Sequence, residues 1–241
     1  MIRIFLGNAG SGKTACAVRE MTLNENDRKT YSNIITKGLK NNIVIKPEMI
    51  IVKEDVENSK KHKLSLNKQF WEDIHEPINV ILDEAHSLMN ARRSMSSVNI
   101  IITDWLAMIR RVLGSADSGY GNLILITQLP NRIDIIARDM ATQVRYHICH
   151  YYKLCRKCGY YWKENNEIPE PLWLCPICSS ARIKKCHHSI EIWHFRNMNS
   201  YMAWHDFAMA SYYRHYFIDD IERYFKHYNT LQWEYMFSEL Y

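Results

Sequence analysis

The sequence predicts an α/β fold in which a mostly parallel central sheet is flanked by helices. A short apolar run, Ile2–Leu6, enters a glycine-rich loop that is followed by a helix-forming segment. Further apolar runs then alternate with segments of helical spacing through residue 150. In such sheets ligands bind at the carboxyl ends of the strands, which is where Gly7, Asp83 and Gln128 fall. We therefore expect these separate parts of the chain to form one site.

The glycine-rich loop matches the phosphate-binding loop of nucleoside triphosphatases. Residues 7–14 read Gly-Asn-Ala-Gly-Ser-Gly-Lys-Thr, which fits Gly-x-x-x-x-Gly-Lys-[Ser/Thr]. Glycines let consecutive N–H groups point at an anion, and we expect Lys13 to reach the β- and γ-phosphates and the Thr14 hydroxyl to hold Mg²⁺. A chance match in a turn is the alternative, and the flanking strand and helix argue against it. The predicted ATP-binding residues are Gly7, Asn8, Ala9, Gly10, Ser11, Gly12, Lys13, Thr14 and Asp83.

Periodicity predicts the other elements of this region. Residues 98–113 place apolar side chains at helical spacing, and the glycine- and serine-rich residues 114–121 end that helix. The lysine-rich residues 53–68 predict a solvated loop or helix. Strands are predicted at residues 33–35, 43–45, 49–52, 78–82 and 123–128.

Two acidic residues follow the predicted strand at residues 78–82. Asp83 would contact Mg²⁺ through its water shell, and Glu84 would polarise the attacking water, as ATP hydrolysis requires. The alternative is that both acids cap the following helix, since acidic side chains favour helix N-termini. Gln128 ends the next strand and is predicted to contact the γ-phosphate or the water; the alternative is a strand-end amide before Pro130. Together with Lys13, these side chains predict an Mg²⁺-dependent ATPase.

Charge that develops on a transferred phosphoryl group calls for a further cation, often an arginine from a neighbouring subunit. Arg110 and Arg111 precede the loop at residues 114–121, while Arg132 and Arg138 follow the strand that ends at Gln128. We expect Arg110 or Arg111 to be this arginine, with a surface arginine as the alternative at each position. The consequence is an oligomeric ring whose active sites lie between subunits.

The order of these motifs resembles the HerA/FtsK superfamily of DNA-pumping ATPases. After the phosphate loop come Leu-Asp-Glu-Ala-His at residues 82–86, the Arg-Arg pair, Thr-Gln at residues 127–128 and Ile-Asp-x-x-x-Arg-Asp at residues 133–139. Within the superfamily, residues 1–150 are most similar to the Zot-like branch, which includes filamentous-phage proteins and genome-packaging ATPases of archaeal and other membrane-containing viruses. The resemblance implies a RecA-like P-loop NTPase fold.

The resemblance also implies ATP-driven translocation of double-stranded DNA, with viral genome packaging into a capsid as the role. Phage Zot proteins carry a membrane-spanning segment that is missing here, which favours the packaging branch. The alternatives are a Zot-like NTPase that acts on protein in virion assembly or secretion, and a nucleotide-dependent binding switch. A DEAH helicase would need a second RecA-like domain, for which 241 residues leave no room. The residues carried over from the family are Lys13, Thr14, Asp83, Glu84 and Gln128.

Four of the seven cysteines form two Cys-x-x-Cys pairs. Cys155 and Cys158 are separated from Cys175 and Cys178 by sixteen residues, the pattern of a zinc ribbon. Four thiolates leave no open position on the metal, so the predicted Zn²⁺ is structural and holds together a small insert that could not bury a core by itself. Cys186, His187 and His188 could be substitute ligands, and we interpret them as part of a returning strand.

The predicted ribbon lies between two segments of alternating polarity, residues 146–152 and 191–195, which we expect to pair as strands that extend the core. The ribbon is expected to contact DNA, a capsid or membrane protein of the virion, or another subunit. Its basic residues favour phosphate contact, and a protein contact stays equally open. These residues are Lys153, Arg156, Lys157, Lys184 and Lys185.

From Tyr201 onward, aromatic residues recur near helical spacing and predict a helical C-terminal region packed on the core or on a neighbouring subunit. Stacking of these aromatics on unpaired bases is the alternative, which Asp219, Asp220 and Glu222 disfavour. The predicted domains are a P-loop ATPase core at residues 1–150, a zinc-ribbon insertion at residues 151–190, and a returning strand with an aromatic helical region at residues 191–241.

Bulk properties set the cellular context. The formal net charge of +5 fits a polyanionic partner without requiring one. No signal pattern precedes the first strand, and the most apolar stretch is interrupted by Asp104 and Arg110, so no membrane span is expected. We expect a soluble protein of the cytoplasm, the host cytoplasm if the protein is viral, or one associated with a virion.

Overall fold

The computed structural model describes residues 1–55, 62–88, 97–114, 121–163, 174–219 and 221–233. Its centre is a nine-stranded sheet with the order β12-β11-β9-β1-β8-β7-β2-β4, to which β10 adds by pairing with β9. The six strands from β9 to β4 run parallel, and β11 is antiparallel to both of its neighbours. This arrangement confirms the predicted α/β fold. The strands are β1 (Ile2–Leu6), β2 (Lys29–Ser32), β4 (Asn42–Val44), β7 (Ile78–Leu82), β8 (Asn122–Ile126), β9 (Gln143–Cys155), β10 (Tyr161–Lys163), β11 (Ile183–Phe195) and β12 (Arg214–Asp219).

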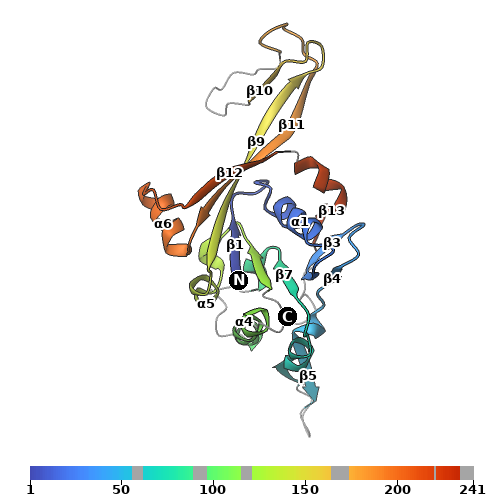
Figure 1. Ribbon diagram of the computed structural model, residues 1–241, viewed down its shortest axis with the longest axis vertical. Helices are drawn as coiled ribbons and strands as arrows, with labels where there is room; N and C mark the ends of the chain where they lie inside the picture. Colours follow the sequence, from blue (N-terminus) through green and yellow to red (C-terminus); the bar gives the residue numbers. More distant parts are fainter. Residues whose placement is uncertain (56–61, 89–96, 115–120, 164–173, 220, 234–241) are drawn as a thin grey trace.

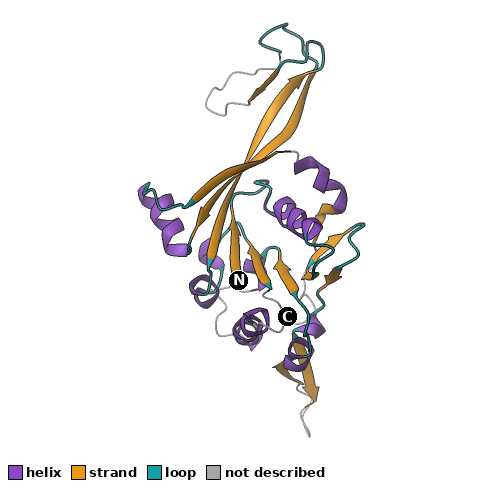
Figure 2. Ribbon diagram, in the orientation of Figure 1, coloured by secondary structure: helices purple, strands orange, loops and turns teal. Residues whose placement is uncertain are grey.

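Helices cover both faces of the sheet (Figure 2). Neighbouring residues of β1 point to opposite faces, so that Ile4 packs into the cluster around Trp105, whereas Phe5 packs into the cluster around Ala17. Both helical layers are therefore anchored on the strand that enters the phosphate loop. The helices are α1 (Lys13–Leu23), α2 (Lys68–Glu72), α3 (Ala85–Leu88), α4 (Ser97–Gly114), α5 (Ile135–Asp139) and α6 (Met198–Phe207), with short 3-10 helices η1 (Pro47–Met49), η3 (Pro130–Arg132) and η4 (Ile221–His227).

Helix α4 has the predicted bounds to within one residue at each end. Its buried side chains include Ile102, Trp105, Leu106 and Ile109, which form the stripe that the helical spacing indicates. The predicted loop that follows lies largely outside the described residues, which resume at Gly121. Among the described helices, none combines the length and apolar character needed to cross a bilayer.

The prediction of a loop or helix for residues 53–68 is wrong for the part that the structure describes. Strands β5 (Ile51–Asp55) and β6 (His62–Leu66) pair as an antiparallel hairpin, with Ile51 opposite Leu66. Leu64 and Leu66 pack against the core cluster that contains Trp71. The two leucines are two residues apart, which is the spacing of a half-buried strand. The segment is so rich in lysine that its overall composition does not indicate this strand.

The C-terminal region is helical only in part, which corrects the prediction of a continuous aromatic helix. Helix α6 ends at Phe207, and the next residue, Ala208, caps it with a left-handed backbone of φ 53°. The chain then forms β12 on the free edge of β11, the short helix η4, and β13 (Tyr228–Trp233), which pairs with β3 (Ile34–Thr36). The edges of β11 and β3 offer free backbone N–H and C=O groups to β12 and β13. Because these groups pair with the chain, it forms strands here although its aromatic residues have helical spacing.

Strands β9 and β11 form a long two-stranded arm that extends beyond the rest of the sheet (Figure 1). They pair antiparallel from Val144 opposite Phe195 to Cys155 opposite Ile183, and the pairing includes the strands predicted at residues 146–152 and 191–195. Both strands run without interruption through residues 150–151 and 190–191. The arm therefore shares its strands with the core.

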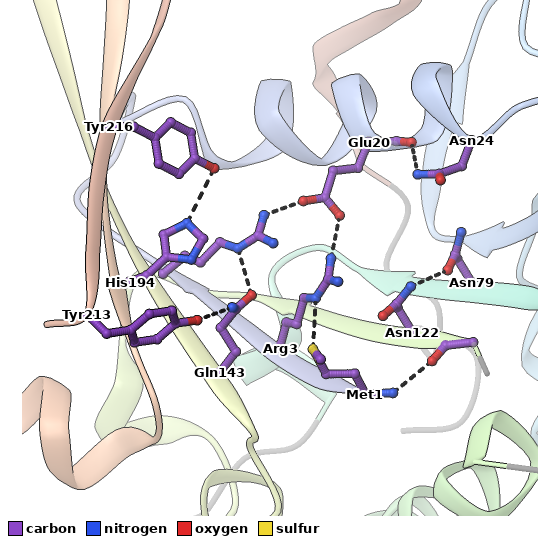
Figure 3. Close-up of polar contacts among 12 residues, drawn as sticks. Met1, Arg3, Glu20, Asn24, Asn79, Asn122, Gln143, His194, Tyr213 and Tyr216 are labelled. Carbon is purple, nitrogen blue, oxygen red and sulfur yellow. Dashed lines mark hydrogen bonds and ion pairs between the residues drawn. The ribbon is translucent and has the colours of Figure 1, made fainter.

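Helix α1 is held on the sheet by the half-buried acid Glu20. Glu20 accepts a hydrogen bond from Arg3 of β1, with 2.9 Å between Arg3 Nη1 and Glu20 Oε2 (Figure 3). The other carboxylate oxygen of Glu20 pairs with Arg145 of β9. One side chain thus joins the helix to two adjacent strands and fixes the direction of the loop between β1 and α1.

Candidate functional site

The loop at residues 7–14 connects the end of β1 to the start of α1, as the motif requires. Gly12 has φ 85°, and a Cβ at this position would lie 2.0 Å from Cδ1 of Ile190. Gly7 has φ 144°, and a Cβ there would lie 2.4 Å from the carbonyl oxygen of His147. Both positions therefore exclude a side chain, because the arm strands β9 and β11 pack directly against the loop.

The side chain of Lys13 folds back onto the loop at residues 7–12. Its Nζ atom donates hydrogen bonds to the carbonyl oxygens of Gly7 and Asn8, each at 2.8 Å, and lies 3.3 Å from Ser11 Oγ. Burial lowers the pKa of Lys13, and the nearby carboxylates of Asp83 and Glu84 oppose this shift. An ammonium group is thereby held against the phosphate loop.

A hydrogen bond joins Thr14, in the first turn of α1, to Asp83, which directly follows β7. The Thr14 hydroxyl donates to Asp83 Oδ2 at 2.7 Å, and the Glu84 N–H donates to Asp83 Oδ1 at 2.8 Å. Burial raises the pKa of Asp83, whereas these two hydrogen bonds lower it. A hydroxyl and a carboxylate in contact are oxygen ligands of the kind that Mg²⁺ binds in proteins. The two residues therefore fit the predicted magnesium position.

The backbone of Asp83 is fixed by Asn33, a residue that sequence reasoning did not assign to the site. Asn33 Nδ2 donates to the carbonyl oxygen of Asp83 at 2.8 Å, and the Asp83 N–H donates to Asn33 Oδ1 at 2.7 Å. Asn33 lies between β2 and β3, and β2 is the neighbour in the sheet of β7, which Asp83 follows. No pattern near Asn33 in the sequence indicates this role.

Glu84 has a left-handed backbone with φ 50°, which is unfavourable for a residue that carries a Cβ. Gln128 Nε2 donates to Glu84 Oε1 at 3.0 Å, and His86 Nδ1 lies 3.2 Å from Glu84 Oε2. His86 in turn contacts the Thr127 hydroxyl at 3.2 Å. The carboxylate is thus oriented from both sides, and His86 is a second site residue that sequence reasoning left out.

A cavity of about 710 Å³ lies beside these groups. The structure brings the loop residues Gly10–Thr14 together with Glu84 and Gln128 at its wall. Five lining residues come from the C-terminal region, where no motif indicated a site. The complete lining is Gly10, Ser11, Gly12, Lys13, Thr14, Ala15, Lys37, Glu84, Gln128, Cys149, Ile190, Ile221, Phe225, Lys226, Tyr228 and Asn229.

The candidate arginines lie away from this cavity. Arg110 and Arg111 are exposed at the end of α4, near the amino end of β8, where the Gly121 N–H donates to the carbonyl oxygen of Leu113. Arg132 is exposed in η3, and Arg138 is half-buried in α5. A role for any of them in catalysis would therefore have to be exerted on a neighbouring subunit, and it stays a prediction.

His147 lies behind the phosphate loop and is fully enclosed. Its Nδ1 lies 3.1 Å from the carbonyl oxygen of Leu6, the last residue of β1, and its ring packs against Phe5 at 4.8 Å between centroids. Burial lowers the pKa of His147 to about 3. The imidazole is therefore neutral at physiological pH, with a proton on Nδ1 that Leu6 accepts.

The four predicted cysteine ligands meet at the far end of the arm. Their Sγ atoms all lie within 4.8 Å of one another, and the closest contacts, Cys155 with Cys178 and Cys158 with Cys175, are 3.5 Å. The backbone N–H of Cys158 lowers the pKa of Cys155 to about 6, which favours a thiolate. Cys186 lies in β11, as predicted, and the side chains of residues 185–188 lie outside the described ones. The cluster could hold a tetrahedral metal ion.

Comparison with known proteins identifies the family. A family model described as zonular occludens toxin (Zot) matches residues 1–154. The chain belongs to the Zot family. No curated protein matches it.

Among solved structures, the chain is similar to the N-terminal domain of zonular occludens toxin from Neisseria meningitidis, with 19% identity, a TM-score of 0.48, and coverage of 95% of this chain and 98% of that one. It is also similar to B204, the DNA-packaging ATPase of Sulfolobus turreted icosahedral virus, with 15% identity, a TM-score of 0.34, and coverage of 60% and 74%. A third is the genome packaging NTPase B204 of Sulfolobus turreted icosahedral virus 2 in complex with ATP-gammaS, with 14% identity, a TM-score of 0.35, and coverage of 60% and 72%.

Proposed function

We propose that this Zot-family protein is an Mg²⁺-dependent ATPase that translocates double-stranded DNA, with packaging of a viral genome into a capsid as its role. The observation that carries the ATPase assignment is the Glu84 carboxylate, hydrogen bonded to Gln128 at the wall of the cavity that the phosphate loop also lines. A phosphate loop alone binds a nucleotide, whereas hydrolysis needs a metal anchor and a residue that orients water. The phosphate loop with Thr14, Glu84 and Gln128 lines one cavity, and Asp83 is hydrogen bonded to Thr14 at its edge.

In the proposed reaction the loop's N–H groups and Lys13 bind the phosphates of ATP. Lys13 exchanges its contacts with the loop carbonyls for contacts with the β- and γ-phosphates. The Thr14 hydroxyl and the Asp83 carboxylate would hold Mg²⁺, which would supply positive charge against the phosphate oxygens. Asn33 keeps Asp83 in place.

Glu84 polarises a water and takes its proton as the water oxygen bonds to the γ-phosphorus, while the bond from that phosphorus to the bridging oxygen breaks. Gln128 contacts both Glu84 and the region of the γ-phosphate, so that it can report the state of the nucleotide. The unfavourable backbone of Glu84 supports this role, because strained residues persist where the surroundings hold them for function.

The DNA part of the proposal is supported by the motif order in the sequence and by the charge of the arm. Residues 151–184, between and around the two cysteine pairs, carry six basic and three acidic residues and are therefore net positive. Cations clustered on one surface favour contact with phosphate groups. The basic residues are Lys153, Arg156, Lys157, Lys163, Arg182 and Lys184.

The test is the rate of ATP hydrolysis with and without double-stranded DNA. We expect stimulation by DNA that weakens as salt is raised, because phosphate contacts are screened. Lys13→Ala is the control for contaminating activity, since it should lose both the basal and the stimulated rate. Basal hydrolysis that no DNA stimulates would contradict the motor.

A motor that acts on protein in virion assembly or secretion is the second candidate. It is favoured by exposed apolar side chains at and just after the end of α6, with Phe207 exposed by 76% and Met209 by 58%. This candidate predicts hydrolysis that responds to a capsid or membrane protein of the virion and not to DNA. A nucleotide-dependent switch would instead show slow turnover that neither partner accelerates.

The proposed motor works as a homo-oligomeric ring, in the cytoplasm of a host cell or on a virion. Arg110 or Arg111 would enter the site of the next subunit. Arg110→Ala subunits mixed with Glu84→Gln subunits test this arrangement, because the mixture should regain turnover at sites where an intact Glu84 meets an intact Arg110. Absence of recovery for both Arg110 and Arg111 variants would argue against the arginine in trans.

A further inference from the structure

The cavity that the phosphate loop lines has wall residues of two chemical kinds. Lys13, Thr14, Glu84 and Gln128 are polar. Ile190, Ile221 and Phe225 are apolar, and Ile190 lies directly beside Gly12 of the loop. A nucleoside triphosphate has the same division, with charged phosphates at one end and a flat, weakly polar base at the other.

We propose that the segment Ile221–Tyr228 is the base-binding wall of the nucleotide site, and that Phe225 stacks on a purine ring. This inference rests on the proposed function of the phosphate loop. It adds a residue that no motif indicates, because the segment lies more than two hundred residues after the loop in the sequence.

The 3-10 geometry of η4 explains how this segment presents Phe225. Side chains three residues apart line up on a 3-10 helix, so Ile221 and Tyr224 form one row and are buried, with 0% and 5% exposure. Both pack in the cluster that contains Ala15 and Ala17 of α1. Phe225 belongs to the next row, is half-buried, and lines the cavity.

The segment is also fastened at its far end. The Lys37 N–H donates to the carbonyl oxygen of His227 at 2.6 Å, and His227 Nδ1 lies 3.1 Å from the carbonyl oxygen of Lys37. Directly afterwards Tyr228 pairs with Thr36 of β3. Because both ends are anchored, the wall is formed before a ligand binds, which lowers the entropic cost of binding.

The residues that line the cavity fit this placement. Phosphates bound by the loop lie at the start of α1, and Ile190 begins the apolar wall directly beside Gly12. Lys37 and Lys226 line the same cavity and add positive charge to that of Lys13, which suits a polyphosphate. Aromatic side chains stack on the faces of bases, and a larger ring system gains more from stacking.

The experiment compares ATP with inorganic tripolyphosphate, which has the charge but no base. With Mg²⁺ and the full-length chain, isothermal titration should give ATP an affinity at least about tenfold above that of tripolyphosphate. Phe225→Ala should weaken ATP by about tenfold and change tripolyphosphate by less than about twofold, and Phe225→Tyr should restore ATP binding. Phe217→Ala, an exposed aromatic of β12 outside the cavity lining, is the matched control and should bind both ligands as the wild type does.

The outcomes separate the two proposals. Equal affinities of the wild type for ATP and tripolyphosphate would overturn the base wall and leave the phosphate site intact. An equal loss of both ligands in Phe225→Ala would also overturn it, because Phe225 would then only support the loop. UTP that binds as tightly as ATP would contradict purine stacking. If neither ATP nor tripolyphosphate binds, the phosphate site fails, and the base wall fails with it.

Discussion

Gln128 Nε2 donates a hydrogen bond to Glu84 Oε1 across 3.0 Å, joining the chain after β8 to the turn after β7. Strand β8 lies between β1 and β7 in the sheet, so Gln128 stands between the phosphate loop and the acid. The residue proposed to sense the nucleotide therefore contacts the residue proposed to activate water. A change at either one is expected to reach the other without any movement of the sheet.

Glu84→Gln should bind ATP and lose turnover. The amide keeps the size of the side chain but cannot take a proton from water, so we expect kcat to fall by about 10²- to 10⁴-fold. The dissociation constant of ATP should stay within about threefold of the wild-type value. Equilibrium binding and steady-state phosphate release measure the two quantities, with Glu48→Gln, an exposed acid on η1, as the control. Wild-type turnover in Glu84→Gln would remove Glu84 from the mechanism.

Asp83→Asn should stabilise the protein in the absence of Mg²⁺. Burial raises the pKa of Asp83 in the folded chain above its unfolded value, so the folded state binds the proton more tightly. Stability is therefore lost as pH rises through the interval between the two pKa values, and it stays lower at neutral pH. The variant removes this loss and should raise Tm by a few degrees at pH 7.5.

The same variant should lose the stabilisation that Mg²⁺ and ATP give the wild type, because the amide carries no charge for the metal. Thermal melts with and without both ligands measure the difference. Thr14 can accept from the new amide group, so the local contacts persist. An equal ligand-induced Tm shift in Asp83→Asn and wild type would show that Asp83 does not hold the metal.

The pH dependence of unfolding should reflect His147. Burial holds its folded pKa near 3, below the ordinary value of 6.5, so the unfolded chain takes up the proton first as pH falls. His147 alone should therefore lower the free energy of unfolding below pH 6.5, by about 2 kcal/mol at pH 5, and His194, whose pKa burial also lowers to about 3, adds to the decrease. Urea titrations over this range provide the measurement.

His147→Asn should flatten this part of the profile, since its amide can donate to Leu6 but does not titrate. His205→Asn, at a side chain exposed by 52%, should follow the wild-type curve. A wild-type profile that is level between pH 7.5 and 5 would mean that His147 is not held neutral.

Metal analysis of the purified protein should find about one zinc ion per chain. Cys175→Ser removes one of the four thiolates and should reduce the zinc content well below this value. Nucleotide binding should persist, because the cysteine cluster lies at the far end of the arm from the loop (Figure 1). Cys149→Ser alters a cysteine outside the cluster and should keep the metal. Zinc-free wild-type protein would contradict the zinc ribbon.

The motif residues were accessible from the sequence because each has a local signature. Gly7–Thr14 is a contiguous pattern, and the acids at residues 83–84 directly follow an apolar strand. The cysteine pairs are recognisable by spacing alone, and their four Sγ atoms do meet in the structure. Helix α4 was likewise predictable, since its buried stripe is long and regular.

Residues whose roles come from contacts between distant segments were not predictable. Asn33 acts on the backbone of Asp83, fifty positions away, and nothing near it in the sequence indicates this. The hairpin of β5 and β6 has only two leucines to show its buried side among lysines. The C-terminal aromatic residues have helical spacing, yet part of this region forms the strands β12 and β13, which pair with the edges of β11 and β3.

The sequence by itself determined the kind of chemistry. A phosphate loop, an acid pair and a Cys-x-x-Cys pair each place their functional groups within a few residues of one another in the sequence. Only the tertiary structure decided what surrounds that chemistry. It brought Ile190, Phe225 and Lys226 to the same cavity as Lys13, because the arm and the C-terminal segment pack on α1 and on the sheet edges. These contacts depend on complementary surfaces and free backbone partners, which no local pattern encodes.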